Sequence, residues 1–378
     1  MVSTHTVSTT APLGSDDPRL SHGRWLRIPG PTVLHPDVVA AMQGEMVPHR
    51  SPEAAILVAR IADNLKSAHR TEQGVYVWAG TGSAGWEASI VNLLSPGDCI
   101  VVTVTGDFGD RYAKTARTFG LDVYRLEVEW GQAVTADMLE AAFTEHGPFK
   151  AAFITHNETS TGLTNPLPEL AKVARAHDAL VVVDAVSSAA ALPLEVDEWD
   201  LDWVLSGVQK AWMCPPGLMV SAVSDRALAA AEKATFPRFF WDVRAMAAAT
   251  ANHTTPTTPA LSLLYGLDAA LKVMLDEGME NVWARHARLG AYMRDGLHAA
   301  GLELLADPAY YSDSITAFYA PHGMTAPEFH DRLRAESGIE IAIGQGHLAS
   351  SILRVGHMGY VEQPELEATL EAIARIAK

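Results

Sequence analysis

The stretch Leu180-Val181-Val182-Val183-Asp184 decides the fold class of this 378-residue chain. A short run of apolar, mostly β-branched residues is typical of a strand buried on both faces, as in a parallel sheet that is covered by helices. Similar runs predict further strands at residues 75–79, 99–104, 123–128, 151–155, 203–205 and 218–223. Amphipathic stretches between them predict helices at residues 53–69, 84–94, 110–119, 136–145 and 167–177. Strands that alternate with helices in this way predict an α/β fold.

The pattern changes after about residue 260. Two long helical stretches, 260–277 and 279–299, precede candidate strands at 302–305, 315–319 and 352–355 and candidate helices at 326–336 and 364–376. We therefore expect a poorly ordered tail at residues 1–22, a large α/β domain at 23–262 and a smaller α+β C-terminal domain at 263–378.

Composition excludes several classes of function. With 28 Lys and Arg against 45 Asp and Glu, the formal net charge is −17, which argues against binding to nucleic acid or to anionic membranes. The two cysteines, Cys99 and Cys214, lie far apart in sequence, so neither a disulfide scaffold nor a cysteine-based zinc site is expected, and no metal site is predicted. No apolar run approaches the roughly 18 residues of a membrane span. The first twenty residues lack the apolar core of a secretory signal, and we expect a cytoplasmic protein.

Ligands of an open α/β sheet bind beyond the carboxyl ends of its strands, so the residues that follow each strand are the candidate site. The first such segment is Gly80-Thr81-Gly82-Ser83-Ala84-Gly85, which opens a predicted helix. Glycines let the backbone approach an anion, and a helix N-terminus offers free N–H groups, so this segment predicts a phosphate site. It also fits the G-x-G-x-x-G dinucleotide pattern, and a plain strand–helix turn is a third interpretation.

Two further junctions carry polar groups. The loop at residues 155–162 is dense in hydroxyl groups, which could bind a ligand or simply cap a helix or a turn. Asp184 ends an otherwise apolar strand, and a carboxylate in that position is unfavourable unless a cation meets it. The alternative is that Asp184 caps the segment that follows.

Lys210 lies between apolar residues and the turn Pro215-Pro216-Gly217. A partly desolvated lysine has a lowered pKa and is a nucleophilic amine, as a Schiff base requires, although a structural lysine with an exposed tip is possible. Pyridoxal 5′-phosphate needs an anion cradle, an acid beside its pyridine nitrogen and a lysine. The segment at 80–83, Asp184 and Lys210 offer these groups at one edge of the predicted sheet.

Ten segments in order resemble those of the class V, fold type I aminotransferases that depend on pyridoxal phosphate, in the branch that acts on alanine, serine or aspartate with glyoxylate. These segments are residues 28–32, 49–52, 80–87, 95–98, 156–162, 183–188, 209–210, 215–218, 280–286 and 354–359. The resemblance runs from about residue 27 to the C-terminus. It implies a large domain with a mixed, mostly parallel seven-stranded sheet, and a homodimer whose active site is shared between subunits.

The resemblance also implies roles for single residues. Lys210 would form the internal aldimine and move the proton between the substrate and the cofactor, and Asp184 would pair with the pyridine nitrogen. The other implied cofactor contacts are Thr81, Gly82, Ser83 and Gln209 at the phosphate, Phe108 stacked on the ring, Thr159 at the phenolic oxygen, Val186, and Thr258 reaching the phosphate of the other subunit. Arg354 would grip the substrate carboxylate, and Gly30 and Thr159 would line the substrate site. Relatives often have aromatic residues where this chain has Thr255 and Thr257.

The leading hypothesis is transamination, in which a small amino acid (serine, alanine or aspartate) gives its amino group to glyoxylate or pyruvate. A second hypothesis keeps the fold but changes the reaction to a lyase, or to an aminotransferase for pyridoxamine or an aminophosphonate. A nicotinamide dehydrogenase would leave Lys210 and Asp184 without a role, and a non-catalytic binding module would leave the reactive groups unused. Cysteine desulfuration needs a catalytic thiol in the C-terminal half, and no cysteine follows Cys214.

Overall fold

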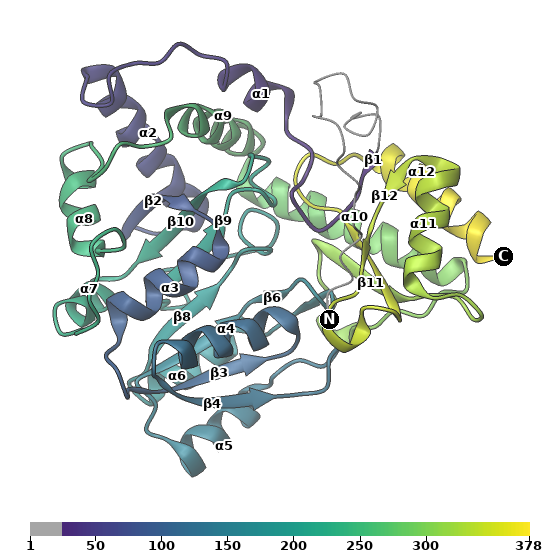
Figure 1. Ribbon diagram of the computed structural model, residues 1–378, viewed down its shortest axis with the longest axis horizontal. Coiled ribbons are helices and arrows are strands. Elements are labelled where there is room, and N and C mark those ends of the chain that lie inside the picture. Colours follow the sequence, from purple (N-terminus) through teal and green to yellow (C-terminus); the bar gives the residue numbers. More distant parts are fainter. Residues whose placement is uncertain (1–24) are drawn as a thin grey trace, which may run out of the picture.

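The computed structural model describes residues 25–378 (Figure 1). The predicted tail at residues 1–22 lies outside this range. Within it, none of the helices combines the length and the apolar character that crossing a membrane would require.

A seven-stranded sheet forms the centre of the large unit, in the order β2-β10-β9-β8-β5-β3-β4. The strands are β2 (Gly74–Gly80), β3 (Cys99–Val104), β4 (Asp122–Glu127), β5 (Ala151–Thr155), β8 (Leu180–Asp184), β9 (Trp203–Gly207) and β10 (Gly217–Val223). Only β10 runs antiparallel to its neighbours. All seven predicted strands are present, and the predicted α/β fold with a mixed, mostly parallel sheet is confirmed.

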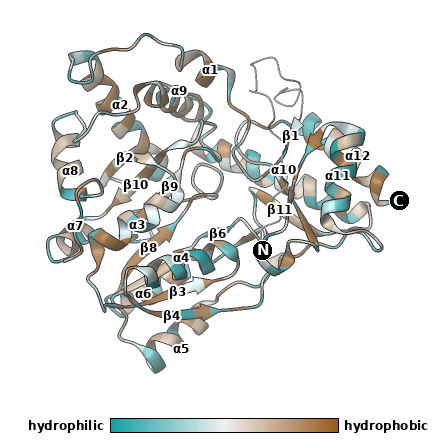
Figure 2. Cartoon of the chain, viewed as in Figure 1, coloured by the Kyte–Doolittle hydropathy of each residue, from teal (hydrophilic) through white to brown (hydrophobic). Residues whose placement is uncertain are grey.

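Helices cover both faces of the sheet. They are α1 (Pro36–Ala41), α2 (Pro52–His69), α3 (Gly82–Leu93), α4 (Asp107–Thr118), α5 (Ala136–His146), α6 (Leu167–Ala176), α7 (Asp225–Ala231), α8 (Val243–Ala251) and α9 (Leu261–Glu277). Alternate residues of β8 belong to two different cores, with Val181 and Val183 in one and Val182 in the other. Figure 2 shows hydrophobic residues along the sheet and hydrophilic ones on outer helices such as α4. This two-sided burial is the physical reason for the unbroken apolar runs.

A smaller unit follows, on the right of Figure 1. It contains α10 (Met279–Ala299), α11 (Ala326–Ser337), α12 (Gln363–Ala377) and a sheet in the order β11 (Ile315–Tyr319), β14 (Ile352–Gly356), β13 (Ala342–Ile343). The short strand β1 (Trp25–Leu26) pairs in parallel with β12 (Ile339–Glu340), so the chain enters through this unit. The strand predicted at 302–305 is wrong: this segment forms a single bridge, Leu304 to Phe318.

Packing assigns α9 to the large unit, although the predicted boundary at residues 262 and 263 assigns it to the small one. The core beneath α2 continues through α9 to Trp283 in α10, whereas the core of the small unit begins at Leu289. Helix α10 therefore connects the two cores, and the division at 262 and 263 stays a prediction.

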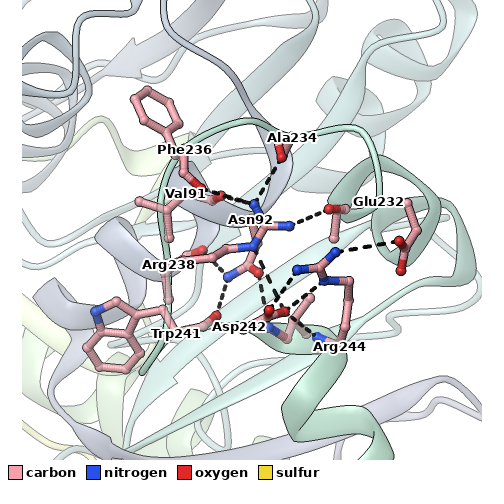
Figure 3. Close-up of polar contacts among 12 residues, drawn as sticks. Val91, Asn92, Glu232, Ala234, Phe236, Arg238, Trp241, Asp242 and Arg244 are labelled. Atoms are coloured by element: carbon pink, nitrogen blue, oxygen red, sulfur yellow. Dashed lines mark hydrogen bonds and ion pairs between the residues drawn. The ribbon is translucent and has the colours of Figure 1, made fainter.

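A polar cluster fixes the segment between α7 and α8 against the end of α3 (Figure 3). The Arg238 guanidinium donates to the carbonyl oxygen of Val91 at 3.1 Å. The side-chain amide of Asn92 donates to the carbonyl oxygen of Trp241 at 2.5 Å and accepts from the backbone N–H of Val243 at 3.0 Å. These bonds hold the carboxyl end of α3, whose opposite end opens at the carboxyl edge of the sheet.

Candidate active site

One cavity lies at the carboxyl ends of β5, β8 and β9, beside the N-terminus of α3. Its lining residues are Gly30, Pro31, Thr81, Gly82, Ser83, Trp86, Phe108, Thr155, Asn157, Thr159, Asp184, Val186, Gln209 and Lys210. The structure thus brings together every site residue that the sequence predicts except Arg354 and Thr258.

The N-terminus of α3 forms an anion cradle in this cavity. Helix α3 begins at Gly82, and its N-cap residue, Thr81, makes no side-chain capping bond. The first N–H groups of a helix have no acceptor within the helix, and its dipole is positive there. A Cβ atom at position 82 would overlap Cγ2 of Val186, so glycine lets Val186 pack directly against the cradle.

Asp184 lies at the tip of β8, next to Thr155 in the neighbouring strand β5. Its Oδ1 accepts from the backbone N–H of Val186 at 2.9 Å, and its Oδ2 accepts from the indole N–H of Trp86 at 2.7 Å. Burial raises the pKa of this carboxyl group, and the two hydrogen bonds and Lys210 oppose the rise. A buried acid in this setting is stabilised by a cationic partner, which a protonated pyridine nitrogen would supply.

Lys210 is buried, and its amine donates to the carbonyl oxygen of Pro29. Burial lowers the pKa of Lys210 to about 8; Arg354 contributes in the same direction, and Asp184 opposes it. The amine is therefore more readily neutral, and nucleophilic, than that of an exposed lysine. Gly30 has a φ of +107°, and a Cβ atom there would lie 2.5 Å from Cδ of Lys210. Only glycine leaves room for this lysine.

Phe108, at the start of α4, is positioned by a buried carboxylate that the sequence analysis did not single out. Glu158 accepts from the backbone N–H groups of Phe108, at 3.3 Å, and Gly109, at 3.1 Å. It also accepts from the hydroxyl group of Ser160 at 2.6 Å and from its backbone N–H at 3.0 Å. The carboxylate meets the positive end of α4, which favours its charge, although burial raises its pKa.

Two buried oxygen atoms at the cavity have no hydrogen-bond partner among the described residues. They are Oγ1 of Thr155 and Oε1 of Gln209. Buried polar atoms are nearly always bonded, so both are available to a ligand. Together with the anion cradle, the buried acid and the lysine, they fit pyridoxal 5′-phosphate.

Arg354 is buried in β14 and does not line the cavity. Its Nη1 donates to the carbonyl oxygen of Thr159 and to Oε1 of Gln345, each at 3.1 Å. Its Nε and Nη2 donate to the carbonyl oxygen of Ile343, at 3.1 and 2.8 Å. Burial lowers the pKa of Arg354 to about 10, so it stays a cation at neutral pH. It lies directly behind Thr159, at the edge of the cavity.

Thr258 is exposed and lines a separate, mostly apolar cavity with Trp78 and Phe240. A single chain therefore does not bring Thr258 to Lys210.

The residues that sequence reasoning missed are Pro29, Trp86, Thr155, Asn157, Glu158 and Gln345. All of them except Gln345 lie within segments quoted above, at residues 28–32, 80–87 and 155–162. Nothing in the spacing of these residues indicates which of them bonds to Asp184 or lines the cavity.

Comparisons with known proteins agree with this geometry. The family model for class-V aminotransferases matches residues 26–368. The chain is 38% identical to a Synechococcus protein named as the small subunit of a soluble hydrogenase, over 93% of this chain and 92% of the relative. It is 36% identical to the L-aspartate–glyoxylate aminotransferase of Paracoccus denitrificans, over 88% of this chain and 85% of the relative. The crystal structure of an alanine–glyoxylate aminotransferase from Nostoc superposes with a TM-score of 0.90, at 29% identity, over 97% of this chain and all of the other.

The fold and the site thus define a fold type I enzyme that uses pyridoxal 5′-phosphate. The chain belongs to the class-V aminotransferases. The resemblance inferred from the ten segments is confirmed, and so is the expectation of a transaminase over a dehydrogenase or a non-catalytic binding module.

Proposed function

We propose that this aminotransferase moves the amino group of a small amino acid, such as serine, alanine or aspartate, to glyoxylate or pyruvate. The observation that carries the proposal is one cavity that holds the Lys210 amine, the Asp184 carboxylate and the N-terminus of α3. The names of the Paracoccus and Nostoc relatives support glyoxylate as the acceptor.

When bound, the cofactor supplies an electron sink for the negative charge left at the substrate Cα. Lys210 would bind the cofactor through its amine. Once the substrate amine has displaced it, the freed amine would take the proton from the substrate Cα and deliver it to the cofactor. Asp184 holds the proton at the ring nitrogen, and the indole N–H of Trp86 fixes the carboxylate in place at 2.7 Å. A lysine with a pKa of about 8 suits proton transfer near neutral pH.

The remaining cofactor contacts follow from the lining of the cavity. The phosphate would be held by Thr81, Gly82, Ser83 and Gln209. The ring would contact Phe108 and Val186, and Thr159 would meet the phenolic oxygen. The aromatic face of Phe108 offers stacking area, and the side-chain amide N–H of Gln209 would be the group that donates to the phosphate. These assignments share one support, which is the common cavity.

Arg354 is assigned to the substrate carboxylate, with Gly30 and Thr159 at the walls of the substrate site. A guanidinium group binds a carboxylate through two parallel hydrogen bonds. Arg354 is a buried cation that does not line the cavity itself. It donates to the carbonyl oxygen of Thr159, a lining residue, at 3.1 Å. Arg354 also contributes to lowering the pKa of Lys210, which supports a place for the substrate between the two cations.

A panel of amino donors tests the function. The loaded enzyme should lose its cofactor absorption band with serine, alanine or aspartate, and glyoxylate or pyruvate should restore it. Release of an oxo acid, measured separately, ties the spectral change to transfer. A response to pyridoxamine or aminophosphonates alone would replace this proposal with the alternative amine donors, and loss of the donor without an acceptor requirement would indicate a lyase.

The homodimer belongs to the same proposal. It is supported by the position of Thr258 outside the cavity and by the exposed aromatic residues Phe239 and Phe240, which are 89% and 44% exposed in one chain. Exposed apolar patches of this kind often form subunit interfaces.

The cytoplasmic location also remains a proposal, and it is supported by the free thiols of Cys99 and Cys214.

Subunit hybrids test the shared site. Lys210→Ala and Thr258→Glu should each be inactive as homodimers, because one lacks the amine and the other repels the phosphate. A hybrid of the two retains one intact site, so refolding an equal mixture should restore about a quarter of the native activity. Light scattering should show a dimer. A monomer, or a mixture that gains no activity, would contradict a shared site.

A further inference from the structure

The hydrogen-bond donors of Arg354 are almost all in use. A guanidinium group has five N–H bonds. Nε and Nη2 each donate to the carbonyl oxygen of Ile343, and Nη1 donates both to the carbonyl oxygen of Thr159 and to Oε1 of Gln345. One N–H of Nη2 is left over. A bidentate grip on a carboxylate needs two, so one present acceptor has to leave when the substrate binds.

Two of the three acceptors are fixed by the backbone. Ile343 belongs to β13, which pairs with β14 and so with Arg354 itself. Thr159 lies in the turn between β6 (Asn157–Glu158) and β7 (Leu163–Thr164), which the bond from the N–H of Gly162 to the carbonyl oxygen of Glu158 closes at 3.0 Å. Moving either carbonyl would break sheet or turn bonds. Gln345 is the acceptor that a side-chain rotation alone removes.

The backbone around Gln345 is also held, which confines the movement to its side chain. Gly344 donates to the carbonyl oxygen of Ile352 at 2.7 Å, and Leu348 donates to the carbonyl oxygen of Gln345 at 3.0 Å. The next residues rest on Trp130: the ring of His347 lies 4.3 Å from it, centroid to centroid. The Gln345 side chain is only partly buried, so solvent can take up its amide once it swings away.

We propose that Gln345 is the gate of the carboxylate site: its amide oxygen occupies an N–H of Arg354 in the resting enzyme, and the substrate carboxylate displaces it. This inference rests on the proposed role of Arg354 in binding that carboxylate. A carboxylate makes a charge-assisted bond that is stronger than the bond to a neutral amide, so it wins the exchange, whereas an uncharged group does not. Gln345 thereby favours substrates that carry a carboxylate.

Propionate, a carboxylate without an amine, is a direct probe of the gate. Its affinity for the cofactor-loaded enzyme is measured by calorimetry and as competitive inhibition. Gln345→Met keeps the length of the side chain but lacks the amide acceptor, so propionate should bind about tenfold more tightly, the low end of the range for a hydrogen bond to a charged group. Gln345→Glu should pair with Arg354 and weaken propionate at least tenfold. The KM for the amino donor should follow both changes, with kcat little altered.

Two controls separate the possible failures. His347→Ala changes the same turn without removing a contact of Arg354, so the affinity for propionate should stay within twofold of the native value. An effect as large as that of Gln345→Met would mean that motion of the loop, and not the amide of Gln345, controls propionate binding. That result would overturn the gate. Arg354→Lys should lose most of the affinity for propionate. If it does, but Gln345→Met binds propionate no better or less well than the native enzyme, the gate is wrong and the carboxylate assignment stands. If Arg354→Lys binds propionate normally, both are wrong.

Discussion

The indole of Trp86 illustrates how one residue outside the reacting groups prepares the site. It donates to Asp184 at 2.7 Å, and its ring stacks on Tyr112 with 5.2 Å between centroids. The buried hydroxyl group of Tyr112 is bonded to that of Ser89 at 2.7 Å. The indole is thus held from behind while it fixes the carboxylate in front, which keeps Asp184 in one orientation despite its raised pKa.

Trp86→Phe should therefore weaken the affinity for the cofactor by about ten- to a hundredfold, since a hydrogen bond to a buried charged group is worth roughly 1.5–3 kcal/mol. Equilibrium dialysis of the cofactor measures this. Trp78→Phe is the matched control, because it removes a buried indole donor to Ser221 in the sheet, 2.9 Å in length, outside the cavity. Equal losses in the two variants would mean that Trp86 acts only through packing.

Single residues were predictable where burial makes them conspicuous in the sequence. Asp184 and Lys210 are charged groups in apolar surroundings, and Gly82 precedes a helix at a strand end. Trp86 could not be assigned, because its partner Asp184 lies 98 positions away in the sequence. Gln345 lies only 9 positions from Arg354, but nothing in that spacing indicates that its side chain meets the guanidinium group. Such pairs become visible only when the strands are assembled.

Among the secondary-structure elements, the start of α3 links the local sequence to the proposed phosphate site. Sequence periodicity placed this start at residue 84, whereas the helix begins at Gly82. Glycine and serine are weak helix formers, so the pattern gave no reason to include them, and it is the extended N-cap at Thr81 that sets the first turn. The strand predicted at 302–305 is limited by Pro308, which follows soon after and opens a 3₁₀ turn. The segment is therefore long enough only for the single bridge between Leu304 and Phe318.

Gly82→Ala tests the close approach between α3 and the loop after β8. The added Cβ overlaps Val186, so the first turn of α3 should move away from the loop after β8. The affinity for the cofactor should therefore fall about tenfold. Val186→Ala in the same chain makes room and should recover part of the loss, although it also removes a proposed contact with the ring. Cofactor affinity is followed by fluorescence quenching. A double variant no better than Gly82→Ala would show that the contact does not set the cradle.

For the molecule as a whole, buried histidines link stability to pH. Burial lowers the pKa of His69 and His156 to about 4 and that of His286 and His357 to about 3. In the unfolded chain a histidine titrates near 6.5. Between that value and the folded pKa the unfolded state binds more protons, so stability is lost as pH falls through this window.

The ring of His69 stacks on Trp212, with 5.3 Å between centroids, away from the cavity. Its share of stability should fall by about 2 kcal/mol between pH 7 and pH 5, the interval over which only the unfolded state becomes protonated. His69→Phe should accordingly lose less stability on acidification than the native enzyme by this amount. Urea unfolding at the two pH values measures the difference, and parallel losses in both proteins would place the linkage elsewhere.

The α/β layers of the whole molecule were predictable from the sequence, because burial of the strands on both faces leaves apolar runs that alternate with amphipathic helices. The boundary between the large and the small unit was harder to predict. Helix α9 is amphipathic in either unit, and only its contacts with α1 and α2 assign it to the large core. The two-residue strands β1 and β12 carry no periodicity of their own, and their pairing comes from the small unit that brings them together.

The central claim is that the amine of Lys210 carries the cofactor. Borohydride reduction of the loaded enzyme, followed by proteolysis and peptide mass spectrometry, tests it most directly. We expect the reduced cofactor on the peptide that contains Lys210, and none on Lys210→Ala treated in the same way. A modified peptide that contains another lysine, or a native enzyme left unmodified although it holds the cofactor, would contradict it.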